Sequence, residues 1–289
     1  MIVTAHCPDQ QTLSRLRNRA DSPHELRWPN VVVYGNYTHL EKIIHESAFT
    51  IFSLTGAGQG KVKTKGQNLR FFRDTLCIFN PFESFEYRIK ESHEVTILNL
   101  HLQLDTYHTL LHDILSSDDA LLNNPDVQSV DYSFYHHIHF NKPIFREKLL
   151  MFDRLPEDEY LLEVRDILTQ LILDSKLSLQ GLALNKKSTK NELLRRVGIG
   201  RDIIFSEYND PNLTIDKLAR EVSMSKYHFI RIFKDAFGFT PHKLIQQIRI
   251  RKAMEFVREG KMTRSAIAFK VGFQETNSLY PLIRGYKIK

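Results

Sequence analysis

Two seven-residue stretches share one pattern: LAREVSM at residues 218–224 and IAFKVGF at residues 267–273. Each has an aliphatic residue and an alanine, a valine three positions after the alanine, a small residue, and then a large apolar side chain. An alanine lets two helices approach closely, and a small residue suits the sharp turn between them. The repeated pattern predicts a tandem pair of helix-turn-helix units.

The residues around the first copy fit two short helices. Thr214 is the expected N-cap of the first helix, whose apolar positions recur at the spacing of one helix face. Those positions are Ile215, Leu218, Ala219 and Val222. Ser225 is the expected N-cap of the second helix. Its expected buried face consists of Phe229, Ile232, Phe233, Ala236 and Phe237.

The other face of the second helix is mostly polar and basic. It carries Lys226, Tyr227, Ile230, Arg231 and Lys234. A recognition helix needs this division, because one side anchors it while the other offers cationic and aromatic groups to a major groove. Gly238 is expected to end this helix, and Thr240-Pro241 to open a long helix that runs to about Arg258.

The order of these elements resembles the AraC-type (AraC/XylS) transcription regulators over roughly residues 191–283. The resemblance rests on both turns, on S-x-x-x-F-x-R-x-F-K at 225–234, on G-x-T-P at 238–241 and on R-x-x-K-A at 249–253. It implies two helix-turn-helix subdomains that read successive major grooves of DNA. It also implies that Tyr227, Ile230 and Arg231 face the bases.

The second unit departs from the pattern of that family. Arg264 stands where the family has an apolar core residue, and Phe269 where a solvated polar residue is usual. Pro281 matches Arg231 of the first unit, and a proline inside a helix costs roughly 3 kcal/mol. The sequence also stops at Lys289, before the closing helix of the family. We therefore expect an atypical or truncated unit that contributes mainly DNA-backbone contacts, through Gln274, Thr276, Asn277 and Arg284.

Charge is distributed unevenly along the 289 residues. Residues 189–289 contain 20 Lys and Arg against 10 Asp and Glu, whereas residues 1–188 contain 20 against 24. A basic C-terminal part beside a mildly acidic N-terminal part is typical of a protein in which one domain contacts phosphates. The alternative is that the excess Lys and Arg only solvate the surface.

The N-terminal half predicts several short strands. Residues 31–34, 49–54, 76–79 and 95–102 are rich in β-branched and aromatic side chains, with turn-forming residues between them. This order resembles the cupin-like jelly roll that AraC-type regulators carry as a sensor. The glycine-rich run at 56–60 is expected to be a hairpin turn, rather than a nucleotide-binding loop, because no helix pattern follows it.

Histidines give the only candidate for a metal site. Catalytic cupins hold a metal with an H-x-H pair, a following Glu and a later His, and no H-x-H precedes the glycine-rich run here. In the cluster at 136–139, His137 and His139 would share one face of an extended chain and could hold a metal. We instead favour a polar strand or loop near the surface, and we expect no metal ligands and no catalytic residues.

A helical pattern begins after Pro156. Its apolar face consists of Tyr160, Leu161, Val164, Ile167, Leu168, Leu171 and Ile172. Two interpretations stay open: this face pairs two subunits, or it packs against its own barrel. The polar residues 180–190 are expected to form a linker, and Thr189 with Glu192 to form a capping box that begins the next helix.

Together these patterns predict an α+β protein. Residues 1–150 would form a cupin-like sensor domain, 151–188 a helical dimerisation segment and linker, and 189–289 an AraC-type DNA-binding domain. Cys7 and Cys77 lack a C-x-x-C spacing, and no apolar run suggests a signal peptide or membrane span, so we expect a cytoplasmic protein.

The leading hypothesis is a sequence-specific transcription regulator that responds to a small molecule or another signal. Its expected partners are double-stranded DNA, an unidentified effector, RNA polymerase and a second copy of the chain, with no cofactor. One alternative is a cupin-type metal enzyme with a DNA-binding appendage. Another is an interaction module whose second DNA-binding unit is inactive.

Overall fold

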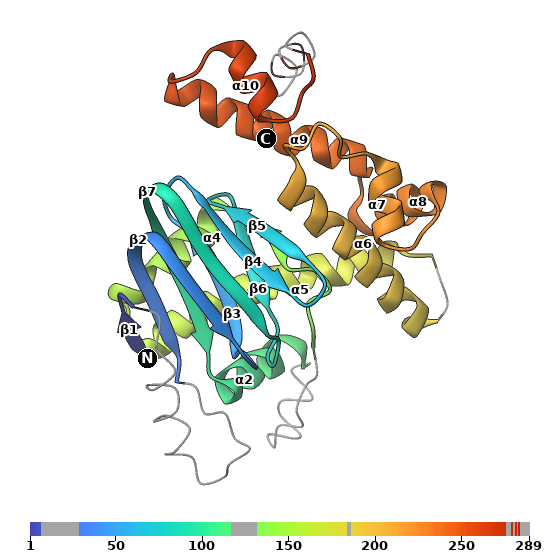
Figure 1. Cartoon of the computed structure of the whole chain (residues 1–289). Coiled ribbons are helices and arrows are strands. Elements are labelled where there is room, and N and C mark those ends of the chain that lie inside the picture. Colours follow the sequence, from blue (N-terminus) through green and yellow to red (C-terminus); the bar gives the residue numbers. More distant parts are fainter. Residues whose placement is uncertain are drawn as a thin grey trace. The chain divides into compact units, whose positions relative to one another are not determined.

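The computed structural model describes residues 1–6, 29–116, 132–183, 186–275, 279, 281 and 283. The chain forms two compact units, Met1–Ser175 and Lys176–Lys289. The first combines a β-sheet with helices and the second is helical, which confirms the α+β class (Figure 1). The closer likeness to a cupin-like jelly roll stays a prediction, as do the domain limits at 150 and 188.

The N-terminal unit is built around one mainly antiparallel sheet (Figure 1). Its strands are β1 (Ile2–Thr4), β2 (Val31–Ile44), β3 (Phe49–Leu54), β4 (Gln59–Thr64), β5 (Asn68–Phe72), β6 (Thr75–Phe79), β7 (Phe85–Leu102) and β8 (Ile138–Phe140). The strand order is β1-β2-β7-β3-β6-β8, and β4 pairs with both β5 and β7. All four predicted strands exist, although β2 and β7 are longer than expected and β4 and β5 were not predicted.

The glycine-rich turn does not close a hairpin. It joins β3 to β4, but β3 pairs with the second half of β7 and β4 with the first half. Gly58 has φ 125°, and a Cβ there would lie 2.5 Å from a methyl carbon of Val95 on β7. The expected hairpin was therefore wrong, because both strands use β7 as their partner. No helix follows this turn, as the sequence indicated.

Side chains alternate between the two faces of the sheet. One face lies in a core with residues of α2 (Leu104–Leu115), α4 (Pro143–Leu149), the 3₁₀ helix η1 (Leu150–Asp153) and α5 (Glu157–Gly181). Its strand residues are Val32, Phe49, Ile51, Leu76, Ile78, Leu98, Leu100 and Leu102. The opposite face is aromatic and centres on Phe52, whose ring lies 4.4 Å from that of Tyr87 and 5.4 Å from that of Phe85.

The apolar face of α5 belongs to this core. Six of its seven predicted residues are buried there: Tyr160, Val164, Ile167, Leu168, Leu171 and Ile172. The seventh, Leu161, is partly buried against the same core. Of the two open interpretations, packing against its own sheet is therefore the one that accounts for this face. A homodimer would have to use another surface and stays a prediction.

The C-terminal unit consists of helices, four of which have a side-chain N-cap. They are α6 (Lys187–Glu207), α7 (Ile215–Glu221), α8 (Lys226–Phe237), α9 (Pro241–Glu259) and α10 (Arg264–Lys270). Thr214, Ser225, Thr240 and Thr263 each accept a hydrogen bond from a backbone N–H of the helix they precede. Gly238 and Gly260 end α8 and α9 in the left-handed conformation, with φ 77° and 68°.

The expected capping box at Thr189 and Glu192 is wrong. Helix α6 begins at Lys187, its N-cap is Lys186, and that residue makes no side-chain capping bond. Both predicted partners therefore lie inside the helix, where Glu192 pairs with arginines one turn further on. Within the described ranges, none of the helices is long and apolar enough to cross a membrane.

Candidate nucleic-acid interface

The first helix-turn-helix unit is α7 followed by α8, and aromatic packing anchors it. Phe229 and Phe233 are fully buried, and their rings lie 5.6 Å apart, edge to face. Helix α6 passes close behind them, since a Cβ on Gly200 would lie 2.8 Å from the Phe229 ring. Burial of two phenylalanines stabilises the helix by several kcal/mol, about 1.5–3 for each side chain. Four of the five predicted core residues of α8 are buried, and the fifth, Phe237, is partly buried.

The turn between α7 and α8 is tightly bonded. The N–H of Ser223 donates to the carbonyl of Arg220 (3.0 Å), and the N–H of Met224 donates to that of Ala219 (2.9 Å). Ser223 adopts φ 54°, a left-handed conformation that is unfavourable for residues other than glycine. The turn thus fixes the angle at which α8 leaves α7.

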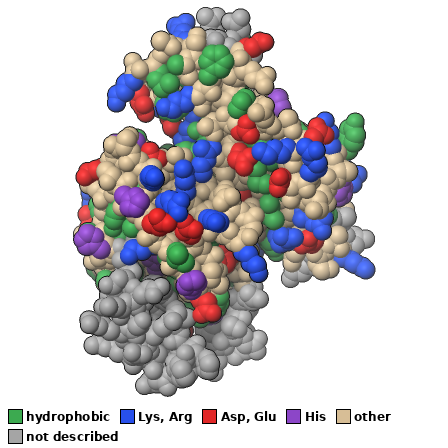
Figure 2. Space-filling model, viewed as in Figure 1, with side chains coloured by type: hydrophobic (Ala, Val, Ile, Leu, Met, Phe, Trp, Pro, Cys, Tyr) green, Lys and Arg blue, Asp and Glu red, His purple; other side chains and the backbone are tan. Residues whose placement is uncertain are grey.

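The exposed face of α8 carries the predicted DNA-contacting side chains. Tyr227 is 84% exposed, and Lys226, Arg231 and Lys234 are also exposed, whereas Ile230 is half-buried. Figure 2 shows Lys and Arg side chains over the helical part of the surface in view, with Asp and Glu among them. These positions agree with the expected division of α8 into an anchored side and an outward side. The contacts with DNA stay a prediction.

Two of these cations already have partners on the protein. Lys226 Nζ lies 2.8 Å from Asp216 Oδ2, and this hydrogen bond lowers the pKa of Asp216 and raises that of Lys226. Arg231 Nη2 lies 3.3 Å from Nδ1 of His228. Both pairs are exposed, so each is worth little to stability and can exchange for a phosphate or a base edge at small cost.

An arginine pair on α6 supports the same turn. Glu192 accepts hydrogen bonds from Arg195 (2.9 and 3.0 Å) and from Arg196 (2.7 Å), which lower its pKa to about 2. Arg196 Nη1 also donates to the carbonyl of Ser223 (3.2 Å). The carboxylate therefore holds Arg196 against the strained residue of the turn. This contact could not be predicted, because nothing in the spacing of residues 192–196 relates them to residue 223.

The second unit repeats the turn at α10. The N–H of Gly272 donates to the carbonyl of Phe269, and the N–H of Phe273 to that of Ala268, both at 3.0 Å. Gly272 has φ 92°. The buried residues of this unit form a small core of Ala253, Ile267, Ala268, Val271 and Leu279. The predicted duplication of the turn is confirmed at the level of its hydrogen bonds.

The outward residues of the second unit are only partly described. Gln274 is exposed, while Thr276, Asn277 and Arg284 lie outside the described residues. Pro281 is exposed and helical, and the N–H of Ile283 donates to the carbonyl of Leu279 (3.1 Å), so a helical turn forms across the proline. Arg264 is exposed where the family has a core residue, and Phe269 is 59% exposed.

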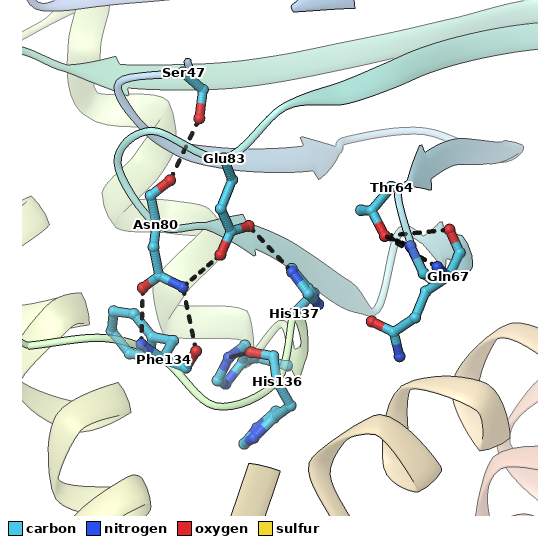
Figure 3. A network of polar contacts seen from close by, with 10 residues as sticks. Ser47, Thr64, Gln67, Asn80, Glu83, Phe134, His136 and His137 are labelled. Atoms are coloured by element: carbon cyan, nitrogen blue, oxygen red, sulfur yellow. Dashed lines mark hydrogen bonds and ion pairs between the residues drawn. The ribbon is translucent and has the colours of Figure 1, made fainter. Parts of the chain in front are cut away.

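The N-terminal unit contains a polar network between the loop after β6 and the segment before β8 (Figure 3). Asn80 Nδ2 donates to Glu83 Oε1 (2.8 Å) and to the carbonyl of Phe134 (3.2 Å), and the N–H of Phe134 donates to Asn80 Oδ1 (2.8 Å). Nε2 of His137 lies 3.2 Å from Glu83 Oε2. The network joins two distant segments of the chain, which is a structural role.

The histidine cluster differs from its predicted position. His136 and His139 are buried, with ring centroids 4.3 Å apart, so the expectation of a surface strand or loop is wrong for them. His139 Nε2 bonds to the carbonyl of His136 (3.1 Å), whereas His137 bonds to Glu83. Across the described parts of the chain, no three His, Cys, Asp or Glu side chains come together as metal ligands would.

A second polar group lies on the aromatic face of the sheet. Asn99 of β7 is 0% exposed, and neither atom of its amide has a hydrogen-bond partner among the described residues. It sits opposite Phe52 on β3 and Val33 on β2. Two residues further along β7, His101 Nδ1 lies 2.9 Å from the Thr50 hydroxyl, and burial lowers the pKa of His101 to about 4.

Known proteins match the C-terminal part of the chain. Residues 218–286 match the helix-turn-helix domain family. The uncharacterized HTH-type transcriptional regulator YbfI of Bacillus subtilis (strain 168) is 32% identical over 75 residues, which cover 26% of this chain and 27% of YbfI. The transcriptional activator RhaS of Escherichia coli (strain SE11) is 26% identical over 111 residues, which cover 37% of this chain and 40% of RhaS.

A solved structure matches part of the chain. It is the C-terminal domain of the two-component response regulator yesN from Fusobacterium nucleatum, with 25% identity and a TM-score of 0.30, and the match covers 32% of this chain and 95% of that domain. The chain spans less than half the length of the curated relatives named above. Residues 218–286, with their two bonded turns, form a helix-turn-helix domain. The match to RhaS agrees with the AraC-type motifs of this region.

Proposed function

We propose that this chain is a sequence-specific DNA-binding transcription regulator that controls promoters in response to a small molecule or another signal. The observation that carries the proposal is α8, whose buried phenylalanines anchor it while its opposite face presents Tyr227, Arg231 and Lys234 to solvent. A helix anchored in this way can enter a major groove without losing contacts within its own domain.

Each predicted DNA-contacting residue of α8 has its own role in this function. Tyr227, Ile230 and Arg231 face the base edges, where a bidentate Arg–guanine pair contributes about 1–3 kcal/mol of discrimination. Lys226 and Lys234 contact phosphates, which adds affinity and salt dependence without sequence information. The second unit adds backbone contacts through Gln274, Thr276, Asn277 and Arg284.

A signal-binding role of the N-terminal unit is supported by Asn99. A buried amide without hydrogen bonds costs about 1–3 kcal/mol, so a partner that satisfies it would stabilise the fold. Its surroundings are aromatic, and His101 nearby is neutral at pH 7 because its pKa is about 4. This environment favours an uncharged ligand that offers both a donor and an acceptor to one amide.

The remaining parts of the proposal follow from promoter control. We propose that the chain acts in the cytoplasm, that a homodimer doubles its DNA-binding surface, and that RNA polymerase is a partner if the chain acts as an activator. The proposal assigns no catalytic residue and no cofactor. The metal-enzyme alternative has no observation in its favour, because His137 and His139 are bonded to separate groups of the protein.

The test is selection of bound sequences from a pool of random DNA duplexes by the purified full-length chain. We expect one enriched motif, bound with an affinity that falls steeply between about 50 and 200 mM salt. Enrichment of no motif would overturn the proposal. For the effector, a panel of uncharged small molecules should contain compounds that raise the melting temperature of the wild type but not of Asn99→Leu.

A further inference from the structure

Arg249 lies in the middle of α9, the helix that joins the two helix-turn-helix units. Its side chain points to the loop between α6 and α7, where Nε donates to the carbonyl of Tyr208 (2.7 Å) and Nη2 to that of Asp210 (2.9 Å). Burial lowers the pKa of this guanidinium, although an arginine stays charged at any physiological pH. One side of Arg249 is thus fixed to the first unit.

The other side of the same guanidinium meets the second unit. Its central carbon lies 5.5 Å from the centre of the Phe273 ring, which follows the turn after α10. A Cβ on Gly272 would lie 3.0 Å from Arg249 Nη2 and 2.9 Å from the backbone carbon of Asn209. The turn of the second unit therefore packs directly on Arg249 and on the loop that Arg249 holds.

These contacts form a junction of three segments, residues 208–210, Arg249 and residues 272–273. A guanidinium suits this place because its planar fork can donate to two carbonyls while its face stacks on an aromatic ring. A lysine lacks this planar fork, so its single ammonium group is a poorer match to the same set of contacts. Gly272 is required for its φ of 92° and also for its closeness to Asn209.

We infer that Arg249 is a positioning residue that fixes the second helix-turn-helix unit against the first, so that the two units meet DNA at one spacing. The consequence for DNA rests on the proposed function, whereas the fixed arrangement of the two units does not. Simultaneous engagement of two linked modules can raise affinity by about 10²- to 10⁴-fold, and this gain is lost when the geometry forbids it. Residues at the junction would thus influence affinity without touching DNA.

The arrangement is tested by measuring the distance between the two units in the full-length chain. Nitroxide labels are attached through Glu221→Cys and Ser265→Cys, both at exposed positions, with Cys7→Ser and Cys77→Ala in the background. Pulsed electron–electron double resonance should give a narrow distribution of distances between the two labels when the junction is wild type. Arg249→Ala should broaden it, Arg249→Lys should broaden it less, and Phe273→Leu should also broaden it.

Arg258→Ala is the matched control, because it removes an exposed arginine from the same helix. It should leave the distribution unchanged. An Arg249→Ala protein that melts as the wild type does and keeps a narrow distribution would overturn the inference. If Arg249→Ala does not fold, the test uses Arg249→Lys and Phe273→Leu instead. Unchanged distance distributions in both variants would then overturn the inference.

The second arm uses DNA and separates the inference from the proposed function. The duplex selected by the wild type is shortened by ~10 base pairs, one helical turn, on the side where the second unit contacts the DNA backbone. The wild type should bind the shortened duplex more weakly than the original, and Arg249→Ala should bind the two alike. If the wild type selects no DNA, the proposed function fails while the distance measurement still tests Arg249. An equal loss of affinity on shortening in the wild type and in Arg249→Ala would count against the inference.

Discussion

Ser223 occupies the turn of the first unit at φ 54°, whereas Gly272 occupies the turn of the second at φ 92°. Each turn is supported from elsewhere in the C-terminal unit, the first by Arg196 at the Ser223 carbonyl and the second by Arg249 beside Phe273. After the turns the two units differ. The first continues into the 12-residue helix α8, whose outer face is cationic, whereas the second has Pro281 at the position that corresponds to Arg231. The turn is therefore repeated, whereas the arginine of the outer face is not.

The largest expected effect is the loss of the first unit when Phe233 is truncated. Phe233→Ala should destabilise this unit by about 3–5 kcal/mol, because the ring is fully buried. Thermal unfolding of the full-length chain measures the loss. Tyr227→Ala is the control and should leave the transition in place, since that ring is 84% exposed. An unchanged transition in Phe233→Ala would show that the first unit is not anchored through α8.

Next in size is the loss of sequence discrimination in Arg231→Ala. The fold should be intact, because Arg231 is exposed, while discrimination for the selected site falls by about 1–3 kcal/mol. Lys234→Ala should instead weaken binding to all sequences and lower the slope of affinity against salt by about one. Titrations of specific and unrelated duplexes separate the two variants. Wild-type affinity in Arg231→Ala would remove Arg231 from the reading surface.

Replacement of Pro281 tests whether the second unit reads sequence at all. Pro281→Arg restores a backbone N–H in the helical turn and supplies a side chain that can reach bases. Binding should tighten, and the DNA protected in a footprint should lengthen by about one half-site. If the wild type already protects two successive grooves and the substitution changes neither length nor affinity, the second unit is a working reader and the contrast drawn above is wrong.

The smallest effects are expected from exchanging the turn residues. Ser223→Gly should raise the free energy of unfolding by at most about 1 kcal/mol, because glycine adopts a positive φ without strain but loses more chain entropy on folding. Gly272→Ser should lower it, since a Cβ would meet the backbone of Asn209 at 2.9 Å. Urea unfolding of both variants gives the two values. If the two substitutions changed the free energy of unfolding in the same direction, the two turns would not differ in their tolerance of a side chain.

Local chemistry made the C-terminal unit predictable. Helix caps, apolar stripes and glycine ends are short-range signals, so the bounds of α7, α8 and α9 and the outer face of α8 followed from the sequence. The capping box at Thr189 failed because its motif also occurs inside a helix, where Glu192 has better partners in Arg195 and Arg196.

Contacts between distant residues were the part that sequence reasoning missed. Strands β4 and β5 are short and partly polar, and their place became visible only through pairing with β7 and with each other. Arg249 was noticed only as part of a motif, and its contacts with residues 208–210 and 273 depend on the packing of three segments. The spacing of residues along the chain does not predict such long-range contacts.

Strand β7 sets the order in which the N-terminal unit can assemble during synthesis. It spans 18 residues, pairs with β2 along nearly its whole length, and gives one half to β3 and the other to β4. The ladders β3–β6 and β4–β5 can close early, but the ladders that β2, β3 and β4 form with β7 cannot close until residues 85–102 are made. The helices of the C-terminal unit depend on nearer partners and should form faster once made, because local contacts carry a smaller entropic cost of closure. The part of the chain synthesised first is therefore the slower one to fold.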